Sequence, residues 1–150
     1  MKSNFQNLGQ SIFEVVIAVA VSALIVTGIV ASATNSIQNS TFSRDKNLAA
    51  NYVQEAIEWL RRERDTDKIV FLKHFDLNTE FCLNYLFWSN FGKCSTEEKI
   101  PNTIFQRNAV FIICDGSTCP SNTVRATVTV SWEDSKGTHD VSSVTDFLIK

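Results

Sequence analysis

The sequence predicts an α+β protein in which a long N-terminal helix packs against a small antiparallel β-sheet. Three features of the chain predict this class. Residues 15–43 form a run of 29 uncharged residues, apolar side chains then recur at helical spacing to about residue 65, and apolar and polar residues alternate strictly from Val124 to Glu133. At 150 residues, the chain can hold one membrane helix and one domain of about 100 residues.

The N-terminal part of the chain has the composition of a membrane-spanning helix. From Val15 to Val30, the only residues that interrupt the apolar character are Ser22, Thr27 and Gly28. With its flanking residues, this segment reaches the roughly 20 residues that a helix needs to cross a bilayer. The sequence therefore predicts that the chain begins in a membrane.

The residues that precede this segment, Gly9-Gln10-Ser11-Ile12-Phe13-Glu14, resemble the cleavage and methylation signature of type IV prepilins. In that family the signature usually reads Gly-Phe-Thr-Leu-x-Glu and opens a long apolar helix. Gly9 and Glu14 match it, whereas Gln10 departs from the commoner Phe or Met. The resemblance implies a leader peptide, residues 1–9, which a prepilin peptidase removes by cleavage after Gly9 before it methylates the new amino group of Gln10. Residues 10–33 then form the transmembrane or filament-core helix.

The resemblance also implies a pilin-like fold and a structural function. The expected protein is a subunit, as a minor pilin, of a type IV pilus, a competence pilus or a type II secretion pseudopilus. Its expected partners are the prepilin peptidase, other pilin subunits, the pilus assembly platform and the membrane. We expect a single-pass protein of the cytoplasmic (inner) membrane with an extracytoplasmic head, which later enters an extracellular pilus or a periplasmic pseudopilus.

Glu14 is the residue for which a physical role in assembly can be argued. A carboxylate costs roughly 2.5 to 3.5 kcal/mol at the centre of a membrane helix and less near the interface. In the dry core of a filament it needs a cation and hydrogen-bond donors. The amino terminus of Gln10 in a neighbouring subunit would supply both. The alternative is that Glu14 lies at the level of the lipid headgroups and has no partner.

The chain beyond the apolar run predicts an amphipathic continuation of the helix over residues 34–65. No proline occurs before Pro101, so we expect one helix from Ser11 to about Asp65. Its predicted buried side carries apolar residues at spacings of three and four, namely Leu48, Tyr52, Val53, Ala56, Ile57 and Leu60.

The charge balance argues against a nucleic-acid partner. Residues 44–150 carry 13 Lys plus Arg against 15 Asp plus Glu. Arg61, Arg62 and Arg64 form a basic cluster, but acidic residues are interleaved with them. We interpret this cluster as a solvated helix end and predict no specific nucleic acid as partner.

Residues 66–150 are predicted to form a β-rich head with three or four antiparallel strands. The alternation from Val124 to Glu133 predicts a strand with one buried face, and Asp134–Gly137 predicts a turn into a weaker strand, Thr138–Leu148. Ile104–Cys114 contains an Ala-Val-Phe-Ile-Ile run that predicts a buried strand. Phe81–Trp88 is predicted as a short strand or a helical turn in a loop region.

The four cysteines, an even number outside the cytoplasm, predict two disulfides. Three connectivities are possible. We favour Cys114–Cys119, which flank a four-residue turn, together with Cys82–Cys94, which would close the loop region. Zinc binding is the alternative, but no Cys-x-x-Cys occurs, and His74 and His139 stand at no ligand-like spacing and are expected on the surface.

No sequence motif predicts an enzyme. The chain has no glycine-rich phosphate loop, no Gly-x-Ser-x-Gly and no His-Glu-x-x-His, so we expect no catalytic residue, metal or cofactor. The alternative function is a binding domain that is secreted or membrane-anchored and uses the apolar segment only as a signal or anchor. Ala31-Ser32-Ala33 would then be a signal-peptidase site with Thr34 as the mature N terminus.

Overall fold

The computed structural model describes residues 7–75, 79–88, 91–117 and 119–149, with side chains from residue 12 onward. It divides into two compact units, residues 1–43 and 44–150. The elements are two helices, α1 (Asn7–Thr66) and α2 (Lys68–Lys73), and four strands, β1 (Thr79–Cys82), β2 (Gln106–Ile113), β3 (Thr123–Asp134) and β4 (Gly137–Leu148). The α+β class is confirmed, with one long apolar helix, an antiparallel sheet and two disulfides.

Helix α1 is continuous over 60 residues. It begins at Asn7, four residues before the predicted start, and ends at Thr66, one residue after the predicted end. No proline interrupts it, and the single glycine within residues 12–66, Gly28, costs only about 1 kcal/mol relative to alanine. Local propensity therefore permits an unbroken helix.

The C-terminal part of α1 presents a buried side to the sheet, and two of the six residues predicted on it, Leu48 and Tyr52, are not fully buried. Val53, Ala56, Ile57 and Leu60 are buried as expected. Leu48 is exposed, and its neighbour Ala49 takes the buried position instead. Trp59, which the spacing did not include, is also buried. The buried apolar residues of α1 are Ala49, Val53, Ala56, Ile57, Trp59 and Leu60. The predicted stripe is therefore kept from Val53 to Leu60, and Ala49 and Trp59 widen it.

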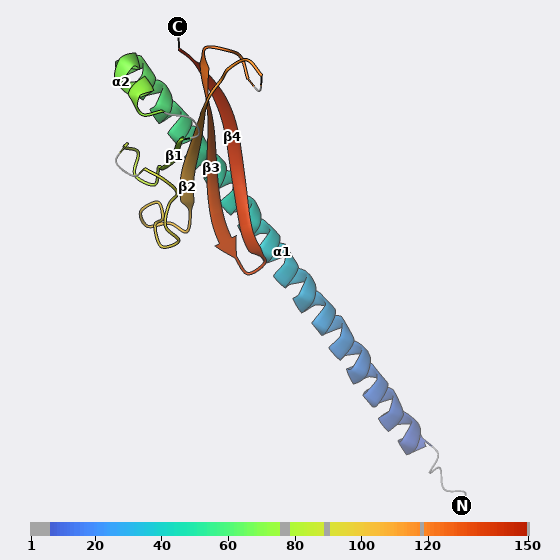
Figure 1. Ribbon diagram of the computed structural model, residues 1–150. Helices are drawn as coiled ribbons and strands as arrows, with labels where there is room; N and C mark the ends of the chain where they lie inside the picture. The colour runs from blue at the N-terminus through green and yellow to red at the C-terminus, as the bar shows by residue number, and fades with distance from the viewer. Residues whose placement is uncertain (1–6, 76–78, 89–90, 118, 150) are drawn as a thin grey trace, which may run out of the picture. The chain divides into compact units, whose positions relative to one another are not determined.

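The four strands form one antiparallel sheet in the order β1-β2-β3-β4 (Figure 1). Strand β3 confirms the alternation read from the sequence, because all its predicted inward residues are buried, namely Val124, Ala126, Val128, Val130 and Trp132. Strand β4 is as long as β3, at 12 residues, and pairs with it along its whole length. The turn between them is Ser135-Lys136, followed by Gly137 at φ +125°, a conformation that glycine adopts readily.

Strand β2 corrects one prediction, and the loop region confirms another in part. The run from Ala109 to Ile113 is not buried throughout: Ala109 and Phe111 are buried, whereas Val110 and Ile112 are half-buried on the other face. An antiparallel sheet that is covered on one face requires this alternation. In the predicted element Phe81–Trp88, only Phe81 and Cys82 belong to a strand, and the residues that follow form bends and turns.

Aromatic residues between α2 and the end of the Phe81–Trp88 segment form a cluster with α1 and the sheet. Trp88 lies against Trp59 of α1, with ring centroids 4.8 Å apart, and against Phe71 of α2, at 5.8 Å. Phe75 stacks on Phe111 of β2 at 4.4 Å. Helix α2, which the sequence did not predict, is capped by the Asp67 carboxylate, which accepts from two backbone N–H groups. Aromatic side chains thus link both helices to the sheet.

Two disulfides, Cys82–Cys94 and Cys114–Cys119, close the loops of the head. The structure has the pairing that the sequence favoured. Cys82–Cys94 ties the end of β1 to the loop before β2, and Cys114–Cys119 closes the connection from β2 to β3.

Candidate functional site

The candidate functional site is the exposed apolar part of α1 together with Glu14. Every side chain from residue 12 to residue 37 is exposed. Thirteen of these are large and apolar: Ile12, Phe13, Val15, Val16, Ile17, Val19, Val21, Leu24, Ile25, Val26, Ile29, Val30 and Ile37. By length and composition, this helix can cross a membrane. An apolar surface of this kind requires lipid or protein around it in place of water.

Three of the five hydroxyl groups in this part of α1 bond to carbonyls of their own helix. Ser22 Oγ donates to the carbonyl of Ala18 over 2.7 Å, and Thr34 Oγ1 donates to Val30 over 3.0 Å. Thr27 Oγ1 likewise donates to the carbonyl of the residue three positions earlier, over 2.9 Å. These bonds remove the need for water at the three hydroxyls, which suits a helix in an apolar surrounding.

Glu14 carries the charge of this segment, and none of the described side chains of α1 binds its carboxylate. Its carboxylate is the only charged group from residue 12 to residue 43. Within the part of the chain that the structure describes, it makes no hydrogen bond or ion pair. An ionisable group in such a segment marks a functional site.

Gly9 and Gln10 lie within α1, and their side chains are outside the described part. Glu14 stands four positions after Gln10, which is about one helical turn and about 6 Å of rise. A chain that began at Gln10 would therefore carry Glu14 at the end of the first turn, where the helix dipole favours a carboxylate. The local geometry is compatible with the predicted roles of both residues.

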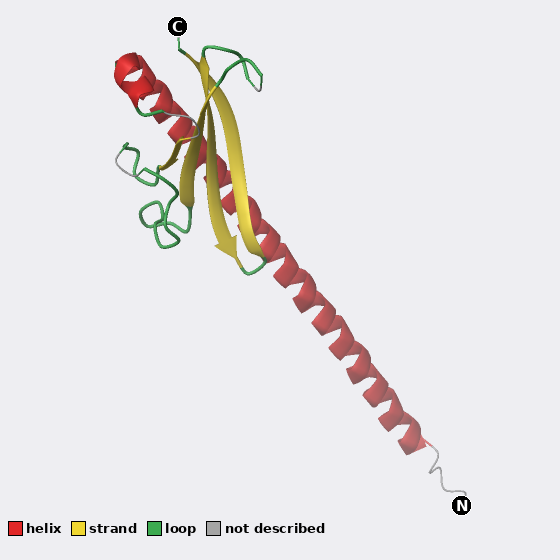
Figure 2. Cartoon of the chain, in the orientation of Figure 1, coloured by secondary structure: helices red, strands yellow, loops and turns green. Residues whose placement is uncertain are grey.

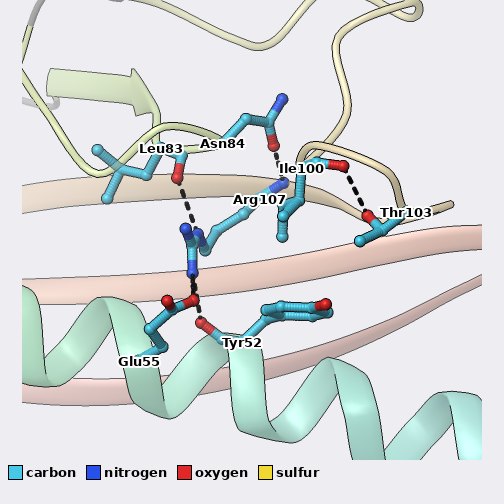
Figure 3. A network of polar contacts seen from close by, with 7 residues as sticks. All are labelled: Tyr52, Glu55, Leu83, Asn84, Ile100, Thr103 and Arg107. Carbon is cyan, nitrogen blue, oxygen red and sulfur yellow. Dashed lines mark hydrogen bonds and ion pairs between the residues drawn. The ribbon is translucent and has the colours of Figure 1, made fainter.

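The head contains a buried charged residue that the sequence analysis missed. Arg107 of β2 is 2% exposed. Its Nε donates to the carbonyl of Leu83 over 2.8 Å, and its Nη1 donates to the carbonyl of Tyr52 over 2.9 Å and to Glu55 Oε2 over 2.8 Å. Its backbone N–H donates to Asn84 Oδ1 over 2.7 Å. Figure 3 shows Tyr52 and Glu55 of α1 and the carbonyl of Leu83 around the guanidinium, and the Asn84 side chain at the backbone N–H of Arg107.

Arg107 therefore joins three parts of the head that are distant in the sequence. Burial lowers the pKa of Arg107 from its ordinary value, and the hydrogen bond and charge of Glu55 oppose that change. The sequence did contain a signal. Arg107 has the same parity in β2 as Ala109 and Phe111, so the alternation places it on the buried face.

The two histidines, which were predicted on the surface, are partly exposed there. His74 stacks on Trp88, with centroids 4.4 Å apart, and His139 Nε2 lies 2.9 Å from Asp134 Oδ1. The N–H of Lys136 and the hydrogen bond with His139 hold the pKa of Asp134 below its usual range. Among the described residues, no group of three or more His, Cys, Asp or Glu side chains could hold a metal ion.

The basic cluster at the end of α1 is engaged with neighbouring acids. Arg61 pairs with Glu58 of the preceding turn, and Arg64 pairs with Asp65. The Arg64 guanidinium also lies over the ring of Phe147, 5.4 Å from its centroid. These interactions occupy two of the three arginines within the head itself.

Comparisons with protein-family models, curated proteins and solved structures give no match to this chain.

Proposed function

We propose that this protein is a structural subunit of a type IV pilus, a competence pilus or a type II secretion pseudopilus, in the manner of a minor pilin. A prepilin peptidase cleaves it after Gly9 and methylates Gln10. Before assembly, the apolar part of α1 anchors the subunit in the cytoplasmic membrane with the head outside the cytoplasm. In the filament, the same surface packs against the helices of other subunits.

The observation that carries this proposal is the isolation of Glu14. Three hydroxyls of the apolar segment bond to carbonyls of their own helix, whereas the Glu14 carboxylate has no partner in the described chain. Together with Gly9 five positions earlier, this is the arrangement that the prepilin signature requires. A plain membrane anchor needs neither a charged group here nor a glycine at that spacing.

The layout of the whole chain also supports the proposal. A long helix that is apolar in its first part and amphipathic in its second, a small antiparallel sheet and two disulfides fit a pilin-like subunit. The helix continues without a break through Ala31-Ser32-Ala33, the site at which a signal peptidase would have to cut. This continuity favours the prepilin hypothesis over the secreted binding domain.

Assembly follows from the electrostatics of Glu14. When a subunit leaves the membrane for the filament, its carboxylate enters an apolar core, where an unpaired charge is costly. The ammonium of a neighbouring subunit's N terminus, at Gln10, is the group that can neutralise it. A pair between these two charges would fix both the register and the direction of subunit addition.

The test is incorporation of Glu14 variants into filaments, in a host that assembles the wild-type subunit. Glu14→Gln keeps the size of the side chain and removes its charge. We expect it to reduce incorporation at least tenfold while cleavage after Gly9 proceeds. Ser22→Ala is the matched control in the same segment, because its hydroxyl bonds only to its own helix, and it should be incorporated normally. Normal incorporation of the Glu14→Gln protein would refute the proposed role of the charge.

A further inference from the structure

Strand β4 forms one edge of the sheet, and no strand among the described residues lies on its outer side (Figure 2). It is 12 residues long, against a typical length of five or six. Its pairing with β3 runs without a bulge from Thr123↔Leu148 to Asp134↔Gly137. The edge is therefore long, and its pairing with β3 is continuous.

The hydrogen bond from Ile149 N–H to the carbonyl of Asn122, at 2.9 Å, fixes which backbone groups of β4 face outward. Ile149 and Asn122 continue the register of β4 and β3, so they form a hydrogen-bonded pair. Because hydrogen-bonded and non-hydrogen-bonded pairs alternate in an antiparallel ladder, the backbone groups of the odd-numbered residues of β4 bond to β3. The N–H and C=O groups of the even-numbered residues then point to the open edge: Thr138, Asp140, Ser142, Val144, Asp146 and Leu148. In the described part of the chain, no hydrogen bond to these backbone groups is found.

The opposite edge of the same sheet is protected. Strand β1 has only four residues. The segment after it returns to cover the strand, with a bridge between Phe81 and Phe91 and a hydrogen bond from Gly92 N–H to the carbonyl of Glu80 over 2.7 Å. Figure 1 shows the loops between β1 and β2 on the β1 side of the sheet. One edge is thus short and covered, whereas the other is long and open.

Strand β4 lacks most of the devices that keep an edge from pairing. It contains no proline and no lysine or arginine. It has two aspartates, but the carboxylate of Asp146 is held by Arg125 of β3 through two hydrogen bonds of 2.8 Å. Asp140 is exposed and has no ion pair within the described residues. A single free negative charge therefore marks this edge.

We propose that the edge of β4 binds an extended segment of a different polypeptide as a fifth strand of the sheet. A second copy of β4 is a poor occupant. The antiparallel register that pairs all six outward residues sets Asp140 of each copy opposite Asp146 of the other, so the free charge of Asp140 would meet a second carboxylate, already paired with Arg125, and no cation. A strand that carries lysine or arginine opposite Asp140 and an apolar residue opposite Val144 is complementary. Main-chain hydrogen bonds supply the affinity, and the charge supplies the selectivity.

The test uses a synthetic peptide of the length of β4, built from alternating Val and Thr, with Lys at the positions opposite Asp140 and Asp146. The control peptide has Glu in place of Lys. Amide hydrogen exchange is followed by NMR on the full chain in detergent micelles. We expect the Lys peptide to slow the exchange of the outward amides, such as Ser142 and Val144, at least tenfold, without changing the exchange at β1.

Two variants make the result specific. Ser142→Pro removes an N–H that faces the open edge, a position at which a sheet tolerates proline, and should weaken the binding of the Lys peptide about tenfold. Ser142→Thr is its control and should bind normally. Asp140→Lys should reverse the preference in favour of the Glu peptide, a result that altered folding alone would not produce.

Three outcomes would overturn the proposal. One is the absence of any protection at about 1 mM Lys peptide, which corresponds to an affinity too weak for a specific strand. A second is unchanged preference between the peptides in the Asp140→Lys protein. The third is dimerisation of the chain alone, seen by sedimentation, with protection of the same β4 amides, which would make a second copy the occupant.

Discussion

The guanidinium of Arg107, on β2, donates to the carboxylate of Glu55, on α1, over an Nη1 to Oε2 distance of 2.8 Å. The two ends of this pair lie in different surroundings, because the side chain of Arg107 is 2% exposed and that of Glu55 is 50% exposed. The buried cation is thus neutralised by an anion at the surface of the head. The pair sets the position of α1 along the sheet, together with the bonds from Arg107 to the carbonyls of Tyr52 and Leu83.

Replacement of Arg107 should destabilise the head. Arg107→Met keeps much of the side-chain volume but leaves two buried carbonyls and one carboxylate without their donor. We expect a loss of about 2 to 3 kcal/mol. The measurement is urea unfolding of the full chain in detergent, followed by the fluorescence of the three tryptophans, all of which lie in the second compact unit, residues 44–150.

Arg61→Met is the matched control, because Arg61 also pairs with a glutamate of α1 but is exposed. It should change the unfolding free energy by less than about 0.5 kcal/mol. Equal effects of the two substitutions would show that the Arg107 contacts do not stabilise the head.

Removal of either disulfide should also weaken the head, and the Cys82–Cys94 bond should matter more. The chain-entropy relation gives about 3 kcal/mol for its separation of 12 residues and about 2 kcal/mol for the separation of 5 between Cys114 and Cys119. The Cys82→Ser/Cys94→Ser and Cys114→Ser/Cys119→Ser proteins can be compared by the same urea titration. Non-reduced peptide mapping of the wild type provides the check on connectivity, and a Cys82–Cys119 link or four free thiols would contradict the structure.

The ion pair between Arg125 and Asp146 should make the head sensitive to acid. The hydrogen bonds from Arg125 hold the pKa of Asp146 below its usual range, and the unfolded chain has the ordinary value of about 3.9. The folded state therefore gains stability from this pair above about pH 4, and loses it as the pH falls through the lowered pKa.

Asp146→Asn should consequently be less stable than the wild type at neutral pH and lose less stability between about pH 5 and pH 2. Asp140→Asn, on the same strand but without an ion pair in the described chain, is the control. If thermal unfolding between these pH values has the same pH dependence in the Asp146→Asn protein and the wild type, the pair does not contribute as stated.

The elements that the sequence predicted are those with a local signal. The period of two from Val124 to Trp132 defines β3, because each side chain reports its own face of the sheet. The absence of proline predicts the continuous helix. The favoured disulfide Cys114–Cys119 follows from a separation that a single turn closes.

The features that the sequence did not predict depend on partners far along the chain. Arg107 is buried because carbonyls 55 and 24 residues away, at Tyr52 and Leu83, accept its hydrogen bonds. Trp59 is buried because Trp88 lies against it. No period in the sequence reports such contacts. The N-terminal site is the opposite case, since Gly9, Gln10 and Glu14 were identified from the resemblance of residues 9–14 to the prepilin signature, and their proposed roles depend on a peptidase and on neighbouring subunits.

The cleavage step can be separated from the later steps by substitution at Gly9. The resemblance to prepilins implies that the peptidase requires a small residue before the scissile bond. Gly9→Val should therefore leave the intact protein in the membrane, whereas Gly9→Ala, the small control, should still be processed. Normal shortening of the Gly9→Val protein would remove the assignment of the cleavage site.

The most direct test of the proposed function is the mass spectrum of the N-terminal peptide of the mature wild-type protein. The proposed function predicts that the chain begins at Gln10 with a methylated, basic amino group, since only a cation there can pair with Glu14. An N terminus at Thr34 would indicate signal-peptidase cleavage, and one at Met1 a plain membrane anchor. Either of these, or a cyclised and uncharged Gln10 in assembled filaments, would contradict the account.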